Sequence, residues 1–400
     1  MIKIISQSML LSVGVIVINF IFKIYLSYQI EKDIVGVFYT FLDVISVAAL
    51  FFTGYKDSMI KLFSEGNFLV VKAYIYRNYS LLTLIFIPIL YLLYEKSVEL
   101  FNVYLLLLFF VLTQISNYYS YFNVAHQNYN SMLFEKTVKA IALISSFTLY
   151  VEFLDTVLAL ILAYITQLLA HISYLYLTSA NIFFIKPIKT KKEIYSKFLR
   201  NYKLATVTSF FGSISIYLSS IVMLYLYQDN KLLADYQVVV KSIFFALVVV
   251  FVHPIAAYTF PELSKLIAKK EYQEVIRIDK KLKKYLFFFM AVIFISLPLT
   301  KYVISFVFPD EYKNSFTMLN MMLPMLPFII YTSFSINILK SFNRFELVLY
   351  IRMIGTFLFF FSIILLHILN FDARNIIYSL DISFFSMFIF ANYYKKKVIS

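Results

Sequence analysis

The sequence predicts an all-α polytopic membrane protein with twelve transmembrane helices. Of its 400 residues, 62% are hydrophobic, 20% are aromatic and only 14% are charged, which leaves too little polar sequence to cover the surface of a soluble domain. Apolar runs of about 20 residues, the length that crosses a bilayer as a helix, recur along the whole chain. These two observations determine the predicted fold class.

Charged residues and turn residues divide the chain into its candidate spans. The approximate ranges are 7–28, 36–55, 79–94, 101–122, 133–151, 156–179, 204–227, 235–258, 285–308, 314–336, 348–369 and 377–394. The loops on one side, counted with the first residues of the spans that follow them, carry 27 Lys and Arg residues, and those on the other side carry five. Because Lys and Arg resist translocation, the basic side is cytoplasmic and both termini are predicted to lie there. The central segment 186–203 alone holds seven basic residues and one acid, and we interpret it as a cytoplasmic loop.

The two halves of the chain repeat one pattern. A shift of 198 residues places Gly14 on Gly212, and a later shift of 204 places Lys61 on Lys265. Each half holds an even number of spans, so both halves have the same orientation, as in transporters built from parallel repeats, and a ligand site is expected between them. The predicted organisation is an N-terminal six-helix lobe over 1–185, a basic cytoplasmic linker over 186–203 and a C-terminal six-helix lobe over 204–400.

Charged side chains inside the spans are the first candidates for function, because each costs about 2.5–3.5 kcal/mol to insert. They include Lys23, Asp43, Lys241, Lys301, Arg352 and Asp381, with Asp235 at a span boundary. Lys23 shares one helical face with Ser12 and Asn19. Asp43 and Lys241 lie at similar depths in corresponding spans, so we expect a cluster of Lys23, Asp43 and Lys241 in the outer half of the membrane. Arg352 and Asp381 lie near span ends and are expected to extend to the interface.

Two interpretations of this cluster stay open. In the structural interpretation, Lys23 and Asp43 form an ion pair, while Lys241 and Lys301 extend to the outer interface. In the functional interpretation, cationic and polar groups bind an anionic substrate, and protonation of Asp43 couples an ion to transport. The substrate-binding candidates are then Lys23, Lys241, Asn19, Ser12 and Lys301.

Other kinds of chemistry find little support in the sequence. It contains no cysteine and no phosphate-binding loop, and its four His residues lack metal-ligand spacing. We therefore predict no catalytic residue, bound metal or cofactor other than a coupling cation, H⁺ or Na⁺. The net charge of +14 comes from residues in short loops, so membrane lipids rather than nucleic acid are the expected anionic partners.

Three segments resemble a known family. Residues 258–266, read together with the basic run that leads to Pro298, are similar to the start of the inner loop in the second half of polysaccharide-type flippases. These belong to the multidrug/oligosaccharidyl-lipid/polysaccharide (MOP) superfamily. Residues 304–312 resemble an apolar run of the family that ends in a turn, with Pro309 where Gly is usual, and 50–61 resemble its counterpart in the first half.

The resemblance implies a fold and a function. The fold would be a V-shaped pair of six-helix bundles, with Lys23, Asp43 and Lys241 in or near a central cavity. Twelve spans favour Wzx-type O-antigen or capsule flippases over lipid II flippases, which usually have fourteen. Such a protein moves polyprenyl-diphosphate-linked oligosaccharide across the bacterial cytoplasmic membrane by alternating access. It would be a monomer that works with a polysaccharide polymerase and a chain-length regulator.

Two alternatives remain. A cation-coupled multidrug or small-molecule antiporter of the same superfamily would be expected to favour acidic groups in its cavity, whereas the candidate residues here lean basic. A membrane glycan polymerase or ligase would need a sizeable outer loop with polar catalytic residues. The predicted outer loops are all short, which disfavours this enzyme.

Overall fold

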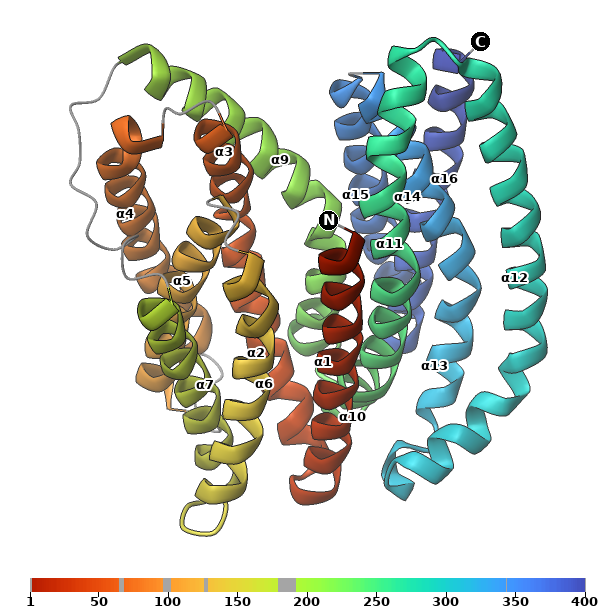
Figure 1. Ribbon diagram of the computed structural model, residues 1–400. Coiled ribbons are helices and arrows are strands. Elements are labelled where there is room, and N and C mark those ends of the chain that lie inside the picture. The colour runs from red at the N-terminus through yellow and green to blue at the C-terminus, as the bar shows by residue number, and fades with distance from the viewer. Residues whose placement is uncertain are drawn as a thin grey trace. The chain divides into compact units, whose positions relative to one another are not determined.

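The fold is built from helices that follow the apolar runs of the sequence. The computed structural model describes residues 2–64, 68–95, 102–125, 129–178, 192–342 and 344–399. Within these ranges it contains helices and no strands (Figure 1). Each of the twelve predicted spans falls on a helical segment, and ten of the described helices are long and apolar enough to cross a membrane. The prediction of an all-α polytopic membrane protein is confirmed.

The helices of the first half are α1 Ile2–Gln29, α2 Lys32–Leu50, α3 Thr53–Ser64, α4 Phe68–Glu95, α5 Val103–Ala125, α6 Tyr129–Tyr150 and α7 Thr156–Thr178. Those of the second half are α9 Lys192–Val222, α10 Asn230–Ala234, α11 Lys241–Ala268, α12 Tyr272–Val307, α13 Ser315–Met322, α14 Leu326–Ser341, α15 Phe345–Ile368 and α16 Ile376–Ile399. Two π-helical segments, η1 Met223–Tyr227 and η2 Asp235–Val240, interrupt the α-helical geometry on either side of α10. The sequence does not predict these two segments.

The chain divides into two compact units. Unit 1 comprises residues 1–30 and 44–210, and unit 2 comprises residues 31–43 and 211–400. Helices α2 and α9 therefore each contribute to both units. The first half of α2 packs within unit 2, although it lies early in the sequence. The predicted lobes over 1–185 and 204–400 stay a prediction.

Residues 192–203, predicted as part of a linker loop, are helical and begin α9. The apolar residues of this stretch recur at helical spacing and pack on an aromatic core of unit 1, formed with Phe52, Tyr55, Tyr79 and Tyr118. Phe198 is fully buried there, and its ring stacks on that of Tyr202 at 6.2 Å between centroids. The Tyr202 hydroxyl donates to the carbonyl oxygen of Phe51 at 2.8 Å. The loop prediction was wrong here because charge was weighed above apolar spacing; residues 186–191 lie outside the described ranges.

The basic stretch that leads to Pro298 does not form a separate loop. It forms the end of α11, a turn, and the start of α12. The turn includes Lys270, whose φ of 60° lies in the left-handed region. Leu263 and Val275 are buried in a core of unit 2 together with Tyr331, Phe334 and Ile338 of α14. These apolar side chains therefore pack on protein rather than on lipid.

Gly36 allows close approach of two helices within unit 2. A Cβ atom at Gly36 would lie 2.8 Å from both the Cα and the N atom of Ala234, which real contacts do not allow. We expect Gly36→Ala to force α2 away from α10 and to destabilise the protein by about 1–3 kcal/mol, as overpacking does in other cores. The measurement is the thermal unfolding temperature of the purified protein in detergent.

Gly14→Ala is the matched control for this change. Gly14 lies on α1, and a Cβ atom there would meet nothing within 4 Å. Alanine is the better helix former, so the unfolding temperature should stay the same or rise slightly. Equal unfolding temperatures for both variants would contradict the close packing of Gly36 on Ala234.

Candidate functional site

Asp43 and Lys241 form a buried ion pair within unit 2. Their exposed fractions are 6% and 9%, and the Lys241 Nζ contacts the Asp43 Oδ2. The same carboxylate oxygen accepts hydrogen bonds from Gln237 Nε2 and from Ser220 Oγ, each at 2.5 Å. Its partners come from α9, η2 and α11, while Asp43 itself lies on α2. A buried pair is tolerated when further hydrogen bonds satisfy its polar atoms, and this arrangement provides them.

The π-helical segment η2 positions the donors to Asp43. It spans Asp235–Val240 and ends where Lys241 begins α11. The Lys241 backbone N–H donates to the carbonyl oxygen of Tyr236, five residues earlier, as a π turn requires. Gln237 and Lys241 both reach one carboxylate from this widened turn. π turns inside α-helices occur frequently at functional sites, so η2 marks this place independently of the charges.

A second layer of polar contacts surrounds the pair. Thr40 Oγ1 accepts a hydrogen bond from Gln237 Nε2 at 3.2 Å and donates to the Gly36 carbonyl oxygen at 3.0 Å. The Lys241 Nζ lies 5.5 Å from the centroid of the Tyr217 ring, a cation–π distance. We call Asp43, Lys241, Gln237, Ser220, Thr40 and Tyr217 the Asp43 network. It links α2 to α9 and α11 through directional contacts.

A further ion pair lies at the beginning of α2. The Lys32 Nζ is 2.8 Å from Asp235 Oδ1, donates to the Glu311 carbonyl oxygen at 2.7 Å, and lies 4.9 Å from the centroid of the Tyr312 ring. Burial, together with the carboxylates of Asp235 and Glu311, raises the pKa of the Tyr312 hydroxyl above its ordinary value, so this ring stays neutral. Lys32 lies between the predicted spans 7–28 and 36–55, so the sequence did not predict this pair.

A sequence signal for the Asp43–Lys241 pair exists in the repeat. The offset of 198 residues aligns Asp43 with Lys241, and corresponding spans of parallel repeats run in the same direction, so these opposite charges come to the same depth. The same offset aligns Lys32 with Asn230 rather than with Asp235, so it does not predict the second pair.

Unit 1 contains a buried polar network that the sequence analysis did not single out. His171 of α7 is fully buried, and its Nδ1 lies 2.7 Å from Ser116 Oγ of α5. Its Nε2 lies 3.5 Å from Glu135 Oε2 of α6, and Glu135 accepts hydrogen bonds from Ser120 Oγ at 3.0 and 3.1 Å. Together with Lys136 and Lys139, Glu135 gives the first half of α6 three charged side chains. The imidazole and the carboxylate lie at ion-pair distance, with no hydrogen bond made by the imidazole Nε2.

A third network joins the ends of α12, α14 and α16 in unit 2. Lys395 is only 1% exposed, and its Nζ lies 2.6 Å from Asp279 Oδ1. Tyr331 donates to the same oxygen at 2.7 Å, and Lys283 Nζ lies 2.9 Å from Asp279 Oδ2. Lys395 lies just beyond the last predicted span, 377–394. The structure extends α16 through it and pairs it with an acid.

The remaining predicted site residues have other surroundings. Lys23 is half-buried and Asn19 is exposed, both on α1 in unit 1, and the Ser12 side chain lies outside the part of the chain that is described. Lys301 is exposed on α12, with its Nζ 5.9 Å from the centroid of the Phe316 ring. Asp43 and Lys241 belong to unit 2, so a cluster of both with Lys23 stays a prediction.

Two details of the earlier interpretations change. The structural interpretation had Lys241 extend to the outer interface, but this side chain is buried and pairs with Asp43. Arg352 was expected to extend to the inner interface. Its guanidinium instead lies against Gly212 of α9, where a Cβ atom would be 2.7 Å from a terminal nitrogen of Arg352. Gly212 therefore makes room for a charged group inside unit 2.

Comparison with known proteins establishes the fold. No family model matches the sequence, and no curated protein matches it. The lipid II flippase MurJ in an inward closed conformation gives a TM-score of 0.76 at 14% identity, covering 98% of this chain and 88% of that chain. A multidrug resistance MATE family transporter of the MOP superfamily, in an inward-facing conformation, gives a TM-score of 0.72 at 14% identity, covering 96% of this chain and 94% of that chain. A MOP superfamily transporter from Pyrococcus furiosus gives a TM-score of 0.58 at 13% identity, covering 99% of this chain and 94% of that chain. The fold is that of MOP superfamily transporters.

The Asp43–Lys241 pair makes a prediction about stability. Removing one partner leaves an uncompensated buried charge, which costs about 3–5 kcal/mol. Lys241→Gln should therefore lower the thermal unfolding temperature more than the double variant Asp43→Asn/Lys241→Gln, in which neither charge remains. Tyrosine fluorescence of the purified protein measures both, because the chain has 34 Tyr and no Trp.

Lys301→Gln is the control for removal of a lysine from a span. Its side chain is exposed, so its unfolding temperature should match that of the wild type. A Lys241→Gln protein that unfolds like the Lys301→Gln protein would contradict the buried pair.

Proposed function

We propose that this protein is a translocase that moves a polyprenyl-diphosphate-linked oligosaccharide across the bacterial cytoplasmic membrane by alternating access. The product would serve O-antigen, capsule or other surface polysaccharide synthesis. The observation that carries the proposal is a buried ammonium group, Lys241, inside a polar network of a fold shared with a lipid II flippase. A buried cation in a membrane protein is costly and marks a place where an anionic group is handled.

A diphosphate would bind by replacing Asp43 as the partner of Lys241. The charge-assisted bond between an ammonium and a phosphate oxygen is strong in a desolvated site, so the exchange keeps the cation paired throughout. Gln237 and Ser220, which now donate to Asp43, would be free to donate to phosphate oxygens. Lys23, Asn19, Ser12 and Lys301 stay candidates for further contacts with the substrate.

The displaced carboxylate of Asp43 would then couple an ion to the cycle. Without Lys241, a carboxylate in this apolar environment is stabilised by taking up H⁺ or Na⁺. The exchange would also release the first half of α2 from α9 and η2, and α2 contributes to both units. Substrate binding, ion binding and a conformational step would thus all depend on Asp43.

The proposal includes a setting in the cell. The protein would act as a monomer with both termini in the cytoplasm, in contact with membrane lipids, alongside a polysaccharide polymerase and a chain-length regulator. The positive charge of the predicted cytoplasmic loops supports this orientation.

A cation-coupled multidrug antiporter is the second candidate. The similarity to a MATE family transporter supports it at the level of the fold as well as the similarity to MurJ supports a flippase. The Asp43 network contains one acid and one cation, so its charge alone favours neither candidate, and transport of the lipid or of a cationic dye distinguishes them.

Translocation depends on the cations in this proposal. Lys241→Gln, Lys23→Gln and the double variant Asp43→Asn/Lys241→Gln should each abolish the flipping of a fluorescent polyprenyl-diphosphate oligosaccharide in proteoliposomes. The double variant is decisive, because it removes the cation without leaving a lone buried acid. Quenching of the outer-leaflet fluorophore by dithionite measures the flipped fraction.

Lys231→Gln is the control, since Lys231 is exposed on α10 and outside the Asp43 network. The same proteoliposomes are also tested with a cationic dye. Wild-type flipping by the double variant and by Lys23→Gln would refute the role of the cations, and transport of the dye without flipping of the lipid would establish the antiporter instead.

Ion coupling makes a separate prediction for Asp43. Asp43→Asn keeps a hydrogen-bond acceptor for Gln237 and Ser220 but cannot take up a proton or hold Na⁺ as a carboxylate does. Flipping by this variant should lose its response to an imposed proton or sodium gradient, while slow flipping without a gradient persists. Full activity with an undiminished response to the gradient would dispose of the coupling role.

A further inference from the structure

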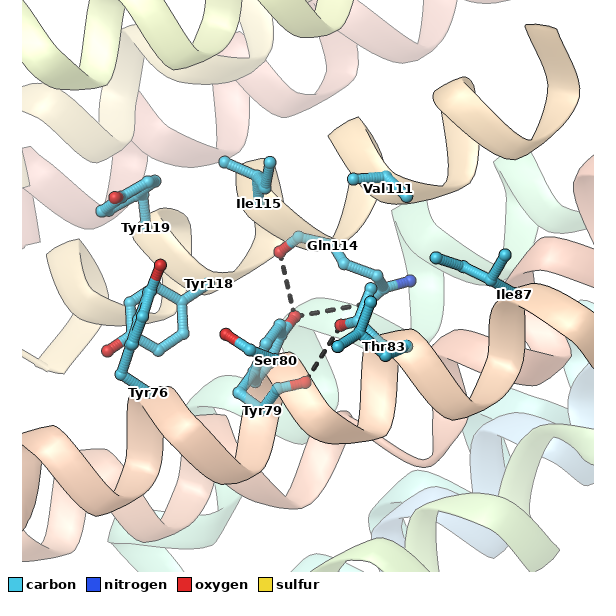
Figure 2. A pocket seen from close by; sticks show the side chains of 11 residues that line it. Tyr76, Tyr79, Ser80, Thr83, Ile87, Val111, Gln114, Ile115, Tyr118 and Tyr119 are labelled. Carbon is cyan, nitrogen blue, oxygen red and sulfur yellow. Dashed lines mark hydrogen bonds between the residues drawn. The ribbon is translucent and has the colours of Figure 1, made fainter. Parts of the chain in front are cut away.

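Several buried polar atoms lack a hydrogen-bond partner within the described ranges, and most of them belong to neutral groups. Two examples, Gln114 Nε2 and the Tyr118 hydroxyl, belong to residues beside a space of about 310 Å³ between α4 and α5, which we call the α4–α5 pocket (Figure 2). Burying an unpaired neutral group costs far less free energy than burying an unpaired carboxylate. Carboxylate oxygens without a partner are therefore the atoms that most need an explanation.

Asp381 of α16 carries such an oxygen. Among the described carboxylates, two oxygens are buried and accept no hydrogen bond, Asp235 Oδ1 and Asp381 Oδ1. Asp235 Oδ1 has the Lys32 ammonium group at 2.8 Å, whereas no cation in the described part of the chain lies at ion-pair distance from Asp381. The sequence analysis expected Asp381 to extend to the interface, but the structure buries this oxygen within unit 2.

Asp381 lies beside a break in a neighbouring helix. The rings of Phe328 and Tyr331 on α14 pack on Phe385 and Phe388 of α16, with centroids 5.4 and 5.6 Å apart, so the two helices run in the same direction. This register places Asp381, four residues before Phe385, level with the residue four before Phe328. That residue is a proline in η4 Leu323–Met325, a 3₁₀ turn between α13 and α14 that packs on α16.

The break offers hydrogen-bond acceptors rather than donors. Pro324 lies in η4, and Pro327 lies in the first turn of α14. Proline has no N–H group, so the carbonyl oxygens of Asn320 and Leu323, each four residues earlier, lose their α-helical donors. The Leu323 oxygen accepts from the Leu326 N–H instead. A carbonyl oxygen cannot bond to a carboxylate, but it accepts a hydrogen bond from a carboxylic acid.

The titratable groups around Asp381 do not supply a counter-charge. The Tyr236 hydroxyl of η2 lies within electrostatic range of Asp381, but it is hydrogen-bonded to Ser219 Oγ at 2.8 Å. The elements packed on α16 are α13, α14, α15, η4 and the 3₁₀ turn η5 Ala373–Asn375. Their ionisable side chains have other surroundings: Tyr331 donates to Asp279, Arg352 lies on Gly212, His367 contacts the Tyr227 ring, Arg374 pairs with Asp372, and Lys340, Glu346 and Tyr350 lie at the end of α14 and the start of α15.

We propose that Asp381 is a proton-binding site of unit 2, a neutral carboxylic acid that donates its proton to a carbonyl oxygen at the α13–α14 break. A carboxyl group in an apolar place without a cation is neutral rather than ionised, and ionisable residues inside membrane spans form proton relays. The side chain as a whole is half-buried, so a small separation of α16 from η4 admits water and lets the proton leave. The inference is independent of the substrate named in the proposed function, and it adds a proton site to the one proposed at Asp43.

Infrared spectroscopy of the protein in phosphatidylcholine nanodiscs tests this proposal without transport. A protonated carboxyl group has a C=O stretching band at higher wavenumber than the amide bands, and this band shifts when H₂O is replaced by D₂O. At neutral pH the wild-type protein should show such a band. Asp381→Asn should lack it, because the amide of Asn is neutral and has a similar shape but has no carboxyl group.

Two further variants make the assignment specific. Asp43→Asn is the matched control, because it removes an aspartate of unit 2 that is paired with Lys241 and should leave the band unchanged. Asp381→Glu keeps a carboxyl group and should move the band rather than abolish it. This variant also serves as the test if Asp381→Asn does not fold, which its thermal unfolding shows.

Each outcome decides the proposal. The expected set is a band in the wild type that is lost in Asp381→Asn, moved in Asp381→Glu and kept in Asp43→Asn. The absence of an exchangeable band from the wild type overturns the proposal, as does an equal band in the wild type and in Asp381→Asn. A band present in choline chloride but lost in sodium chloride overturns it in favour of a sodium site. Failure of lipid flipping refutes the proposed function alone, since the spectra require no substrate.

Discussion

The buried Asp43–Lys241 pair constrains the packing of the helices around it, because both charges need bonded partners. Two charges in an apolar environment are stable only when they are paired and their remaining polar atoms are bonded. Here one carboxylate oxygen collects donors from Lys241, Gln237 and Ser220. The donors come from three segments that are far from Asp43 in sequence, so satisfying one charge also determines the register of α2 against α9 and α11. The close approach of Gly36 to Ala234 brings α2 next to the end of α10, from which η2 and α11 continue.

Each unit is stabilised internally by a different kind of contact. The core of unit 1 around Phe52, Tyr55, Tyr79 and Phe198 is largely aromatic, and such packing tolerates small displacements. Unit 2 adds ion pairs between distant segments, with Lys32 bound to Asp235, Asp43 to Lys241 and Lys395 to Asp279. Charged pairs have narrow geometric requirements, and each is either made or broken. Unit 2 is therefore the part of the described chain in which discrete rearrangements have the clearest physical basis.

Hydropathy was sufficient to predict the fold, because a bilayer requires long apolar helices and the chain shows them plainly. It was not sufficient to predict the partners of the charges. The sequence analysis placed Asp43 in a cluster with Lys23 and Lys241, since all three lie at suitable depths, but depth does not determine which helix faces which; within unit 2 the structure describes the contact with Lys241. The repeat offset of 198 had already aligned Asp43 with Lys241. Glu135 was missed because it lies at the beginning of the predicted span 133–151, and His171 because the four His residues lack metal-ligand spacing; the packing of α5, α6 and α7 brings the two together. The α4–α5 pocket could not be predicted, because among 34 tyrosines the sequence does not distinguish those that line a cavity.

The π-helical segment η2 has a mechanical consequence. A π turn holds one more residue than an α turn, and successive residues of an α-helix are about 100° apart around its axis. Conversion of η2 to regular α geometry would turn the following part of α11, beginning with Lys241, by roughly that angle and move it about 1.5 Å along the axis. The ammonium group of Lys241 would then separate from Asp43 and point in a different direction around the helix axis. A change of one residue per turn in Asp235–Val240 would therefore be enough to present the same cation to two different surroundings.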